Sequence, residues 1–154
     1  MRVSLHALMD HPSPLILSLP HVLPAEARVN TLLELLSAPL AAAMGESSAV
    51  IAASAREREA EGSTYLGRGL AVPHARVAGL RQAGFCLAAT EPGTLWQGEP
   101  AEMVVLIAVP EAFPELYLQM VSSLLRQYTP LHKSGMLTPA ALEQALRSTF
   151  SPQK

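Results

Sequence analysis

The 154-residue sequence has little of what would indicate a secreted, membrane-spanning or nucleic-acid-binding protein. Its single cysteine, Cys86, excludes an intrachain disulfide and a cysteine cage for a metal, and it favours a reducing, cytoplasmic setting. The longest unbroken apolar run, 103–109, is much shorter than the roughly 20 residues that a membrane helix needs. At the N-terminus, Asp10 soon follows Arg2 among the apolar residues, so a secretory signal is not expected.

Charge is also scarce. Charged residues make up 16% of the chain, the formal net charge is −2, and no basic block is present, so binding to nucleic acid through phosphate neutralisation is not expected. Hydrophobic residues make up 49%, which excludes a disordered chain. A chain of this length suits one domain that buries its core without a disulfide or a metal.

Helical and strand patterns alternate along the sequence. Residues 1–11 predict an irregular arm, and 12–150 a single domain. The expected elements are a short strand at 15–19, a helix from Pro24 that ends or kinks at Pro39, a helix from a Ser47 or Ser48 cap to about Ala60, strands at 83–89 and 102–109, a helix at 114–127, and a helix that Thr138 caps and Pro139 begins. This order predicts an α/β sandwich in which helices cover a central sheet, and the short connections favour a mixed sheet.

One histidine stands out by its surroundings. His74 follows Pro73, precedes Arg76, and is expected to end an exposed loop with several glycines, in which backbone amides can approach an anion closely. Four arginines lie near it along the chain, namely Arg56, Arg58, Arg68 and Arg76. A neutral imidazole is a nucleophile at pH 7, and guanidinium groups stabilise charge on a phosphoryl group. The alternative is a turn histidine among surface arginines.

The order of these segments resembles a known family. Arg58 is followed by Gly62, Ser63 and Thr64, and then by a segment at 67–76 that reads Gly-Arg-Gly-Leu-Ala-Val-Pro-His-Ala-Arg. These motifs, and a later strand ending in Val-Pro-Glu at 109–111, are similar to the IIA domain of the bacterial phosphoenolpyruvate:sugar phosphotransferase system. The match is to the fructose/mannitol type and its nitrogen-regulatory branch.

The resemblance implies roles for individual residues. His74 takes the place of the histidine that accepts a phosphoryl group, Arg58 that of the site arginine with Arg56 as the alternative register, and Arg76 that of the basic residue after the acceptor. The resemblance also implies a phosphoryl-binding loop of Ser63, Thr64, Gly67 and Gly69. No metal or organic cofactor is implied, and a homodimer is left open.

One position departs from the family. The family usually has a second histidine near the start of the helix after the Val-Pro-Glu strand, and counting from that strand places Tyr117 there. A tyrosine hydroxyl donates a hydrogen bond but carries no positive charge, so weaker stabilisation of a phosphoryl group is expected. We expect Tyr117 within reach of His74, with its hydroxyl towards the imidazole or the phosphoryl group.

Three functions remain open at this point. The first is a phosphoryl relay that accepts from the small histidine phosphocarrier protein and passes the group to a IIB domain, which would make it a phosphotransferase component. The second is a regulatory protein of the nitrogen branch that binds other proteins and is switched by phosphorylation. The third is an unrelated α/β domain in which the Pro-His motif is accidental.

Other residues have simpler interpretations. Cys86 is expected to be buried and inert, Trp96 to be a packing residue, and His132 to lie at the surface. The acidic residues Glu57, Glu59 and Glu61 are interpreted as a solvated helix end. A hydrolase with paired carboxylates would need a second acidic partner, which is lacking.

Overall fold

The computed structural model describes residues 12–150, so the arm expected at 1–11 lies outside the described residues. The spatial order of the main sheet is β1 (Leu15–Ser18), β5 (Gly84–Ala89), β8 (Met103–Pro110), β3 (Leu70–Ala71) and β2 (Tyr65–Gly67), with β4 (His74–Val77) also paired to β8. β1 runs parallel to β5, β5 runs antiparallel to β8, and β3 and β4 run parallel to β8. The predicted mixed sheet is confirmed.

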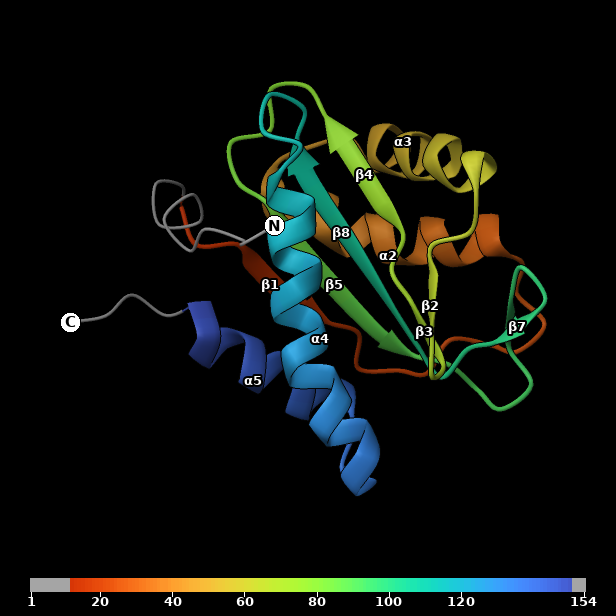
Figure 1. Cartoon of the computed structure of the whole chain (residues 1–154). Coiled ribbons are helices and arrows are strands. Elements are labelled where there is room, and N and C mark those ends of the chain that lie inside the picture. The colour runs from red at the N-terminus through yellow and green to blue at the C-terminus, as the bar shows by residue number, and fades with distance from the viewer. Residues whose placement is uncertain (1–11, 151–154) are drawn as a thin grey trace.

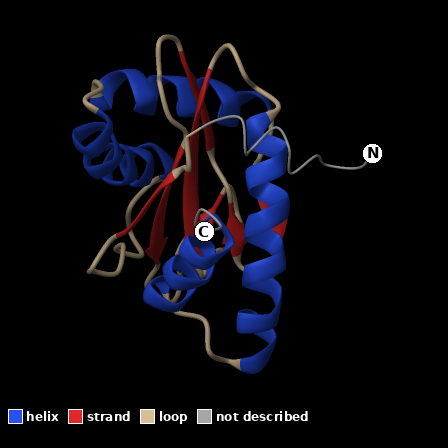
Figure 2. Cartoon of the chain, turned by 90° about the vertical axis from the view of Figure 1, so that its left-hand side faces the viewer, coloured by secondary structure: helices blue, strands red, loops and turns tan. Residues whose placement is uncertain are grey.

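Helices cover both faces of this sheet (Figures 1 and 2). Helices α2 (Val29–Met44) and α3 (Ser48–Glu61) pack on one face, and α4 (Leu116–Ser134) and α5 (Pro139–Phe150) on the other. The central strand β8 is buried along its whole length, because its alternate side chains enter the two cores. Leu106 contributes to the core under α2, and Ile107 to the core under α4.

Two helices run through a proline, and one of these prolines, Pro39, was predicted to end or kink its helix. Helix α2 begins at Val29 rather than at Pro24, and it continues past Pro39 to Met44, so the expected end at Pro39 is wrong. Leu36 and Leu40 are both fully buried, and their packing holds the helix across the missing hydrogen bond. Helix α4 likewise passes Pro130 and ends beyond the predicted 114–127. The predicted start of α5 is confirmed, since the Ala141 amide donates to the Thr138 hydroxyl at 3.0 Å.

Strands β3 and β4 are two parts of one interrupted strand along the edge of β8. Leu70 pairs with Met103 and His74 pairs with Ile107, so both parts keep the same register. Pro73 lies in the interruption, where it has no N–H to donate, although its carbonyl still accepts from the Ile107 amide at 2.9 Å. The interruption frees the backbone groups immediately before His74 for other partners.

The outer edge of β4 is covered by α3. The Ser54 hydroxyl accepts a hydrogen bond from the Arg76 amide at 2.8 Å and donates one to the Arg76 carbonyl at 3.0 Å. The α3 helix itself starts at the predicted Ser47 cap, which accepts from the Val50 amide. A small hairpin of β6 (Leu95–Trp96) and β7 (Glu99–Pro100) lies outside the main sheet, in the predicted turn-rich connection.

Candidate functional site

His74 is the first residue of β4 and is buried, with 7% of its surface exposed. Its imidazole Nε2 is enclosed and has no hydrogen-bond partner. The ring stacks on Tyr117, with 3.7 Å between ring centroids and 10° between planes. The expectation that His74 ends an exposed loop is therefore wrong. Because the interrupted strand resumes at His74, this residue is held by the ladder to β8 and by helix α4 above it.

The environment keeps this imidazole neutral. The pKa of His74 is lowered from 6.5 to about 4. Burial is the largest cause, and the positive charges of Arg76 and Arg58 add to it. His74 and Arg76 lie two residues apart in β4, so both side chains project from the same face of the strand. At pH 7 the ring thus retains a nitrogen lone pair, which is the form that a nucleophilic imidazole requires.

The two arginines considered for the site have different surroundings in the structure. The Arg58 guanidinium acts on the pKa of both His74 and Tyr117, and its Nη1 donates to the Gly62 carbonyl at 2.9 Å. Arg56 instead lies 4.0 Å from the Glu34 carboxylate on α2. The side chain that α3 brings to His74 is therefore that of Arg58.

Tyr117 lies against His74, as its position in the sequence predicted, but its hydroxyl has another partner. The hydroxyl donates to the Val72 carbonyl at 3.0 Å, in the interruption between β3 and β4. Burial raises the pKa of Tyr117 to about 12, so the phenol stays neutral over the physiological range. The expectation that the hydroxyl faces the imidazole or a bound phosphoryl group is thus corrected: Tyr117 offers the flat face of its ring.

The glycine-containing segment does not form an anion cradle beside His74. Gly67 and Gly69 belong to the turn between β2 and β3, next to Met103, whereas His74 pairs with Ile107. The four-residue difference along β8 corresponds to about 13 Å. The Gly69 amide already donates to the Tyr65 hydroxyl at 2.9 Å.

That turn has its own requirement for glycine. Gly69 has φ +79°, and a Cβ at this position would collide with the Glu102 side chain. Arg68, at φ +55°, shares the turn, and its carbonyl accepts from the Tyr128 hydroxyl at 2.7 Å. Arg68 is thus held at the far end of the interrupted strand. We keep neither glycine, nor Arg68, in the candidate site.

Ser63 and Thr64 lie between Arg58 and β2, and their polar groups are turned to local partners. The Thr64 amide donates to the Glu59 carboxylate at 3.2 Å, and the Thr64 hydroxyl donates to the same carboxylate. The Ser63 hydroxyl accepts from the Tyr65 amide at 3.1 Å. The Thr64 amide is therefore already bonded to Glu59 and is not offered to a phosphoryl group.

The sequence interpretation missed Glu59. It was assigned to a solvated helix end, but it is 6% exposed, and the buried Trp96 also donates to its carboxylate, at 3.2 Å. A signal was present, because Ile51, Ala55 and Glu59 follow each other at intervals of four on the buried face of α3. The many charged residues around Glu59 suggested exposure, although its four-residue spacing from Ala55 indicated burial.

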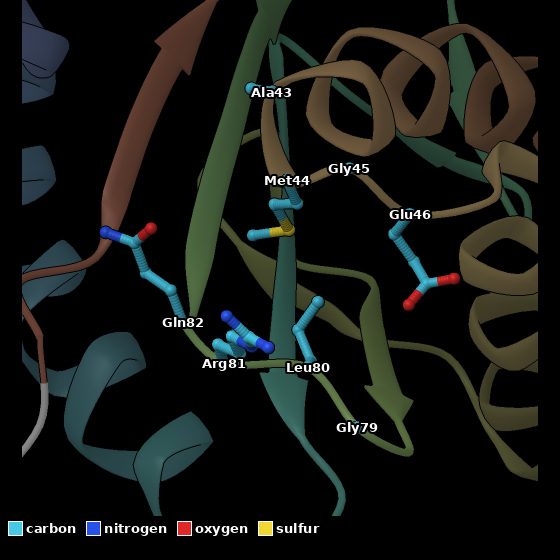
Figure 3. Close-up of a pocket in the computed structure, with 8 residues that line it drawn as sticks. All are labelled: Ala43, Met44, Gly45, Glu46, Gly79, Leu80, Arg81 and Gln82. Carbon is cyan, nitrogen blue, oxygen red and sulfur yellow. The ribbon is translucent and has the colours of Figure 1, made fainter.

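Neither of two cavities in the structure includes His74. One, of about 420 Å³, lies between the C-terminal end of α2 and the loop after β4, with Glu46 and Arg81 among its lining residues (Figure 3). The other, of about 470 Å³, lies beside His132 and Glu102. His74 instead lies at the start of β4, with Tyr117 of α4 stacked on its ring. No helix in the part of the chain that the structure describes is long and apolar enough to cross a membrane.

The fold and the buried, uncharged histidine beside arginines define a domain of the phosphotransferase-system IIA class. Residues 22–146 match the model of the family described as "Phosphoenolpyruvate-dependent sugar phosphotransferase system, EIIA 2", and the chain belongs to this family. The alternative of an unrelated α/β domain is therefore wrong. Membership is consistent with a phosphoryl relay.

Individual relatives show where the chain stands in the family. It is similar to the nitrogen regulatory protein IIA-Ntr from Neisseria meningitidis, with 26% identity and a TM-score of 0.66 over 87% of this chain and 93% of that one. IIA mannitol from Escherichia coli has the same fold, with 19% identity and a TM-score of 0.61 over 85% and 94%. A 57-residue stretch is 42% identical to the 2-O-alpha-mannosyl-D-glycerate-specific EIIABC component of Escherichia coli, covering 34% of this chain and 9% of that protein.

Proposed function

We propose that this protein is a cytoplasmic phosphoryl relay that accepts a phosphoryl group on His74 from a histidine phosphocarrier protein and passes it to a IIB domain. The observation that carries the proposal is the neutral, buried imidazole of His74, flanked by Arg58 and Arg76. A protonated imidazole has no free lone pair, so the low pKa of His74 keeps the nucleophile available.

The reaction exchanges one nitrogen–phosphorus bond for another. A ring nitrogen of His74 donates its lone pair to phosphorus as the bond to the carrier's histidine breaks. The electron pair of that bond stays on the departing imidazole, which takes up a proton, while the other ring nitrogen of His74 releases its proton to solvent. Transfer to a IIB domain repeats the exchange with phospho-His74 as the donor, so no net oxidation or hydrolysis occurs.

The flanking arginines supply what the transferred group needs. Charge is spread over the three phosphoryl oxygens during transfer, and guanidinium groups stabilise it electrostatically. The Gly62 carbonyl holds one side of Arg58, while Arg76 is exposed at its place in β4. Tyr117 adds no charge, so the two arginines carry the electrostatic stabilisation in this proposal.

The surroundings of His74 suit a protein donor. Leu118, which follows Tyr117 in α4, is an apolar side chain that is 65% exposed. Such a surface fits the apolar centre of a protein interface.

The test is phosphorylation of the intact chain by phosphoenolpyruvate and the two general carrier proteins. We expect the intact mass to rise by one phosphoryl group, and the label to be lost in acid and retained in base, as a phosphoramidate is. An unchanged mass with an active carrier, or an acid-stable label, would refute the proposal.

A second candidate function is regulation, in which phosphorylation of His74 switches binding to another protein. The 26% identity with IIA-Ntr favours it, as does Tyr117 in the place of the family's second histidine. The two functions separate in the same assay. Rapid loss of the label to added IIB domains supports the relay, whereas stable labelling combined with phosphorylation-dependent capture of a partner supports regulation.

A further inference from the structure

The carboxylate of Glu59 is buried at the end of α3 and is held by neutral donors alone. It accepts from the amide and the hydroxyl of Thr64, from the Trp96 indole and from the Gln97 side-chain amide. These donors come from two segments that are far apart in the sequence, the loop at 62–64 and the β6–β7 hairpin. A single carboxylate thus ties both segments to α3.

Burying a carboxylate is costly unless its oxygens are hydrogen-bonded. Here the set of donors is large enough to satisfy both oxygens, and Gln97 adopts a left-handed backbone conformation, with φ +49°, where its side chain reaches the site. A hydrophobic residue would fill the same space without this cost. A buried carboxylate that gathers four hydrogen bonds from two separate segments points to a positioning task.

The loop that Glu59 holds is connected to His74 by hydrogen bonds. The carbonyl of Thr64 accepts from the Val72 amide at 3.1 Å. The Val72 carbonyl accepts from the Tyr117 hydroxyl, and the Tyr117 ring stacks on His74. Val72 is bonded to Thr64 through its amide and to Tyr117 through its carbonyl, so one chain of hydrogen bonds links the loop that Glu59 holds to the ring that stacks on His74.

The same loop also orients Arg58. Its guanidinium Nη1 donates to the carbonyl of Gly62, two residues before Thr64. The loop that Glu59 holds is therefore bonded to both parts of the site: to Arg58 directly, and to Tyr117, which covers His74, through Val72.

We propose that Glu59 is a positioning residue whose carboxylate, by holding the 62–64 loop, sets the Tyr117 ring against His74 and directs Arg58 to the phosphoryl position. The kinetic part of this inference rests on the proposed acceptor role of His74, whereas the geometric part does not. Glu59 touches neither His74 nor a transferred group, so it is not a catalytic residue.

The test compares Glu59→Gln with Glu57→Gln. Both changes remove one negative charge from the same turns of α3, but Glu57 is exposed. In Glu59→Gln the new side-chain amide presents N–H groups to donors, so the loop is released. We expect transfer to slow on the order of tenfold to hundredfold, because small displacements of reacting groups are costly. Glu57→Gln should keep the wild-type rate.

A second readout is the titration of His74 followed by NMR, which needs no phosphorylation. Release of Tyr117 should expose the imidazole and raise the pKa of His74 from about 4 towards 6.5 in Glu59→Gln. Loss of a negative charge alone would lower that pKa, so a rise reports geometry. The groups that act on His74 besides burial are Arg76 and Arg58, and both remain in this variant.

Thr64→Val guards against a Glu59 variant that does not fold. It removes one donor to Glu59, and Thr94→Val is its control, because Thr94 is equally buried but donates to the Glu91 carbonyl outside this network. A folded Glu59→Gln or Thr64→Val with the wild-type titration of His74 would overturn the positioning role. If the titration shifts but the wild type is not phosphorylated, the geometric inference holds and the proposed function fails.

Discussion

Helix α4 carries two tyrosines that stack on two histidines, and the two pairs lie towards opposite ends of the sheet. Near the start of α4, Tyr117 lies on His74 with 3.7 Å between ring centroids. Three turns later, Tyr128 lies beside His132 with 5.4 Å between centroids. Each tyrosine hydroxyl donates to a backbone carbonyl of the segment that precedes His74. In both places a tyrosine of α4 that is bonded to this segment faces a histidine ring, at different separations.

The two pairs differ in the surroundings of the imidazole Nε2 atom. His132 Nε2 lies 3.0 Å from a Glu102 carboxylate oxygen, and both side chains are partly exposed. His74 Nε2 is buried without a partner, and its neighbours in charge are arginines. Burial beside arginines favours the neutral imidazole at His74. Stacking on a tyrosine is common to both histidines, and burial beside arginines sets His74 apart, so His132 serves as an internal control for His74.

The largest expected effect breaks this comparison directly. His74→Gln should abolish phosphorylation by the carrier proteins, because an amide has no nucleophilic nitrogen, while His132→Gln should be labelled at the wild-type rate. Gln is the better replacement, since His74 is buried against Tyr117 and His74→Ala would leave a cavity. A labelled His74 variant, or an unlabelled His132 variant, would show that His74 is not the acceptor.

The next effect concerns the arginines of α3. Arg58→Ala should slow phosphorylation on the order of 10²–10³-fold, since one well-placed donor to a developing charge contributes that much. Arg58→Lys should recover only part of the loss, because an ammonium does not reproduce the fork of a guanidinium. Arg56→Ala, whose side chain faces Glu34, is the control and should change the rate little. Single-turnover labelling measures all three, and the reverse order would favour the other register.

Much of this architecture could be predicted from the sequence. The caps Ser47 and Thr138 and the apolar run of β8 are local signals, and each was found where expected. The mixed sheet followed from short connections. Pro39 misled because its cost is local, whereas the burial that overrides it is tertiary.

The finer arrangement of the site was beyond local signals. His74 was expected in a loop because the register that joins β3 to β4 along β8 depends on residues more than 30 positions away. The glycines suggested an anion site but serve a turn. Glu59 finds its partners Trp96 and Gln97 only after the hairpin folds back. Long-range pairing of this kind leaves no periodic trace in the sequence.

Acid stability sharpens the comparison through the protonation of His74. Its pKa is 6.5 in the unfolded chain and about 4 in the folded one, so the unfolded state binds more protons between these values. The free energy of unfolding should therefore fall as the pH drops from about 6.5 to 4, by up to about 3 kcal/mol in total. Urea unfolding at a series of pH values measures this. His74→Gln should lose most of this dependence and His132→Gln should keep it; equal slopes in the wild type and His74→Gln would contradict the burial of a neutral ring.

The smallest expected effect separates the two tyrosines. Tyr117→Phe and Tyr128→Phe each remove one hydroxyl that donates to a backbone carbonyl, at 3.0 and 2.7 Å. Both variants should therefore lose on the order of 1 kcal/mol in the free energy of unfolding. Only Tyr117→Phe should also slow phosphorylation, by a few-fold, because its ring still stacks on His74 but is no longer fixed to the Val72 carbonyl. Stability and labelling rates measured on the same preparations make the test internal. Equal slowing of phosphorylation in Tyr128→Phe and Tyr117→Phe would contradict this prediction. It would show that the rate at His74 does not depend on which of the two tyrosines faces it.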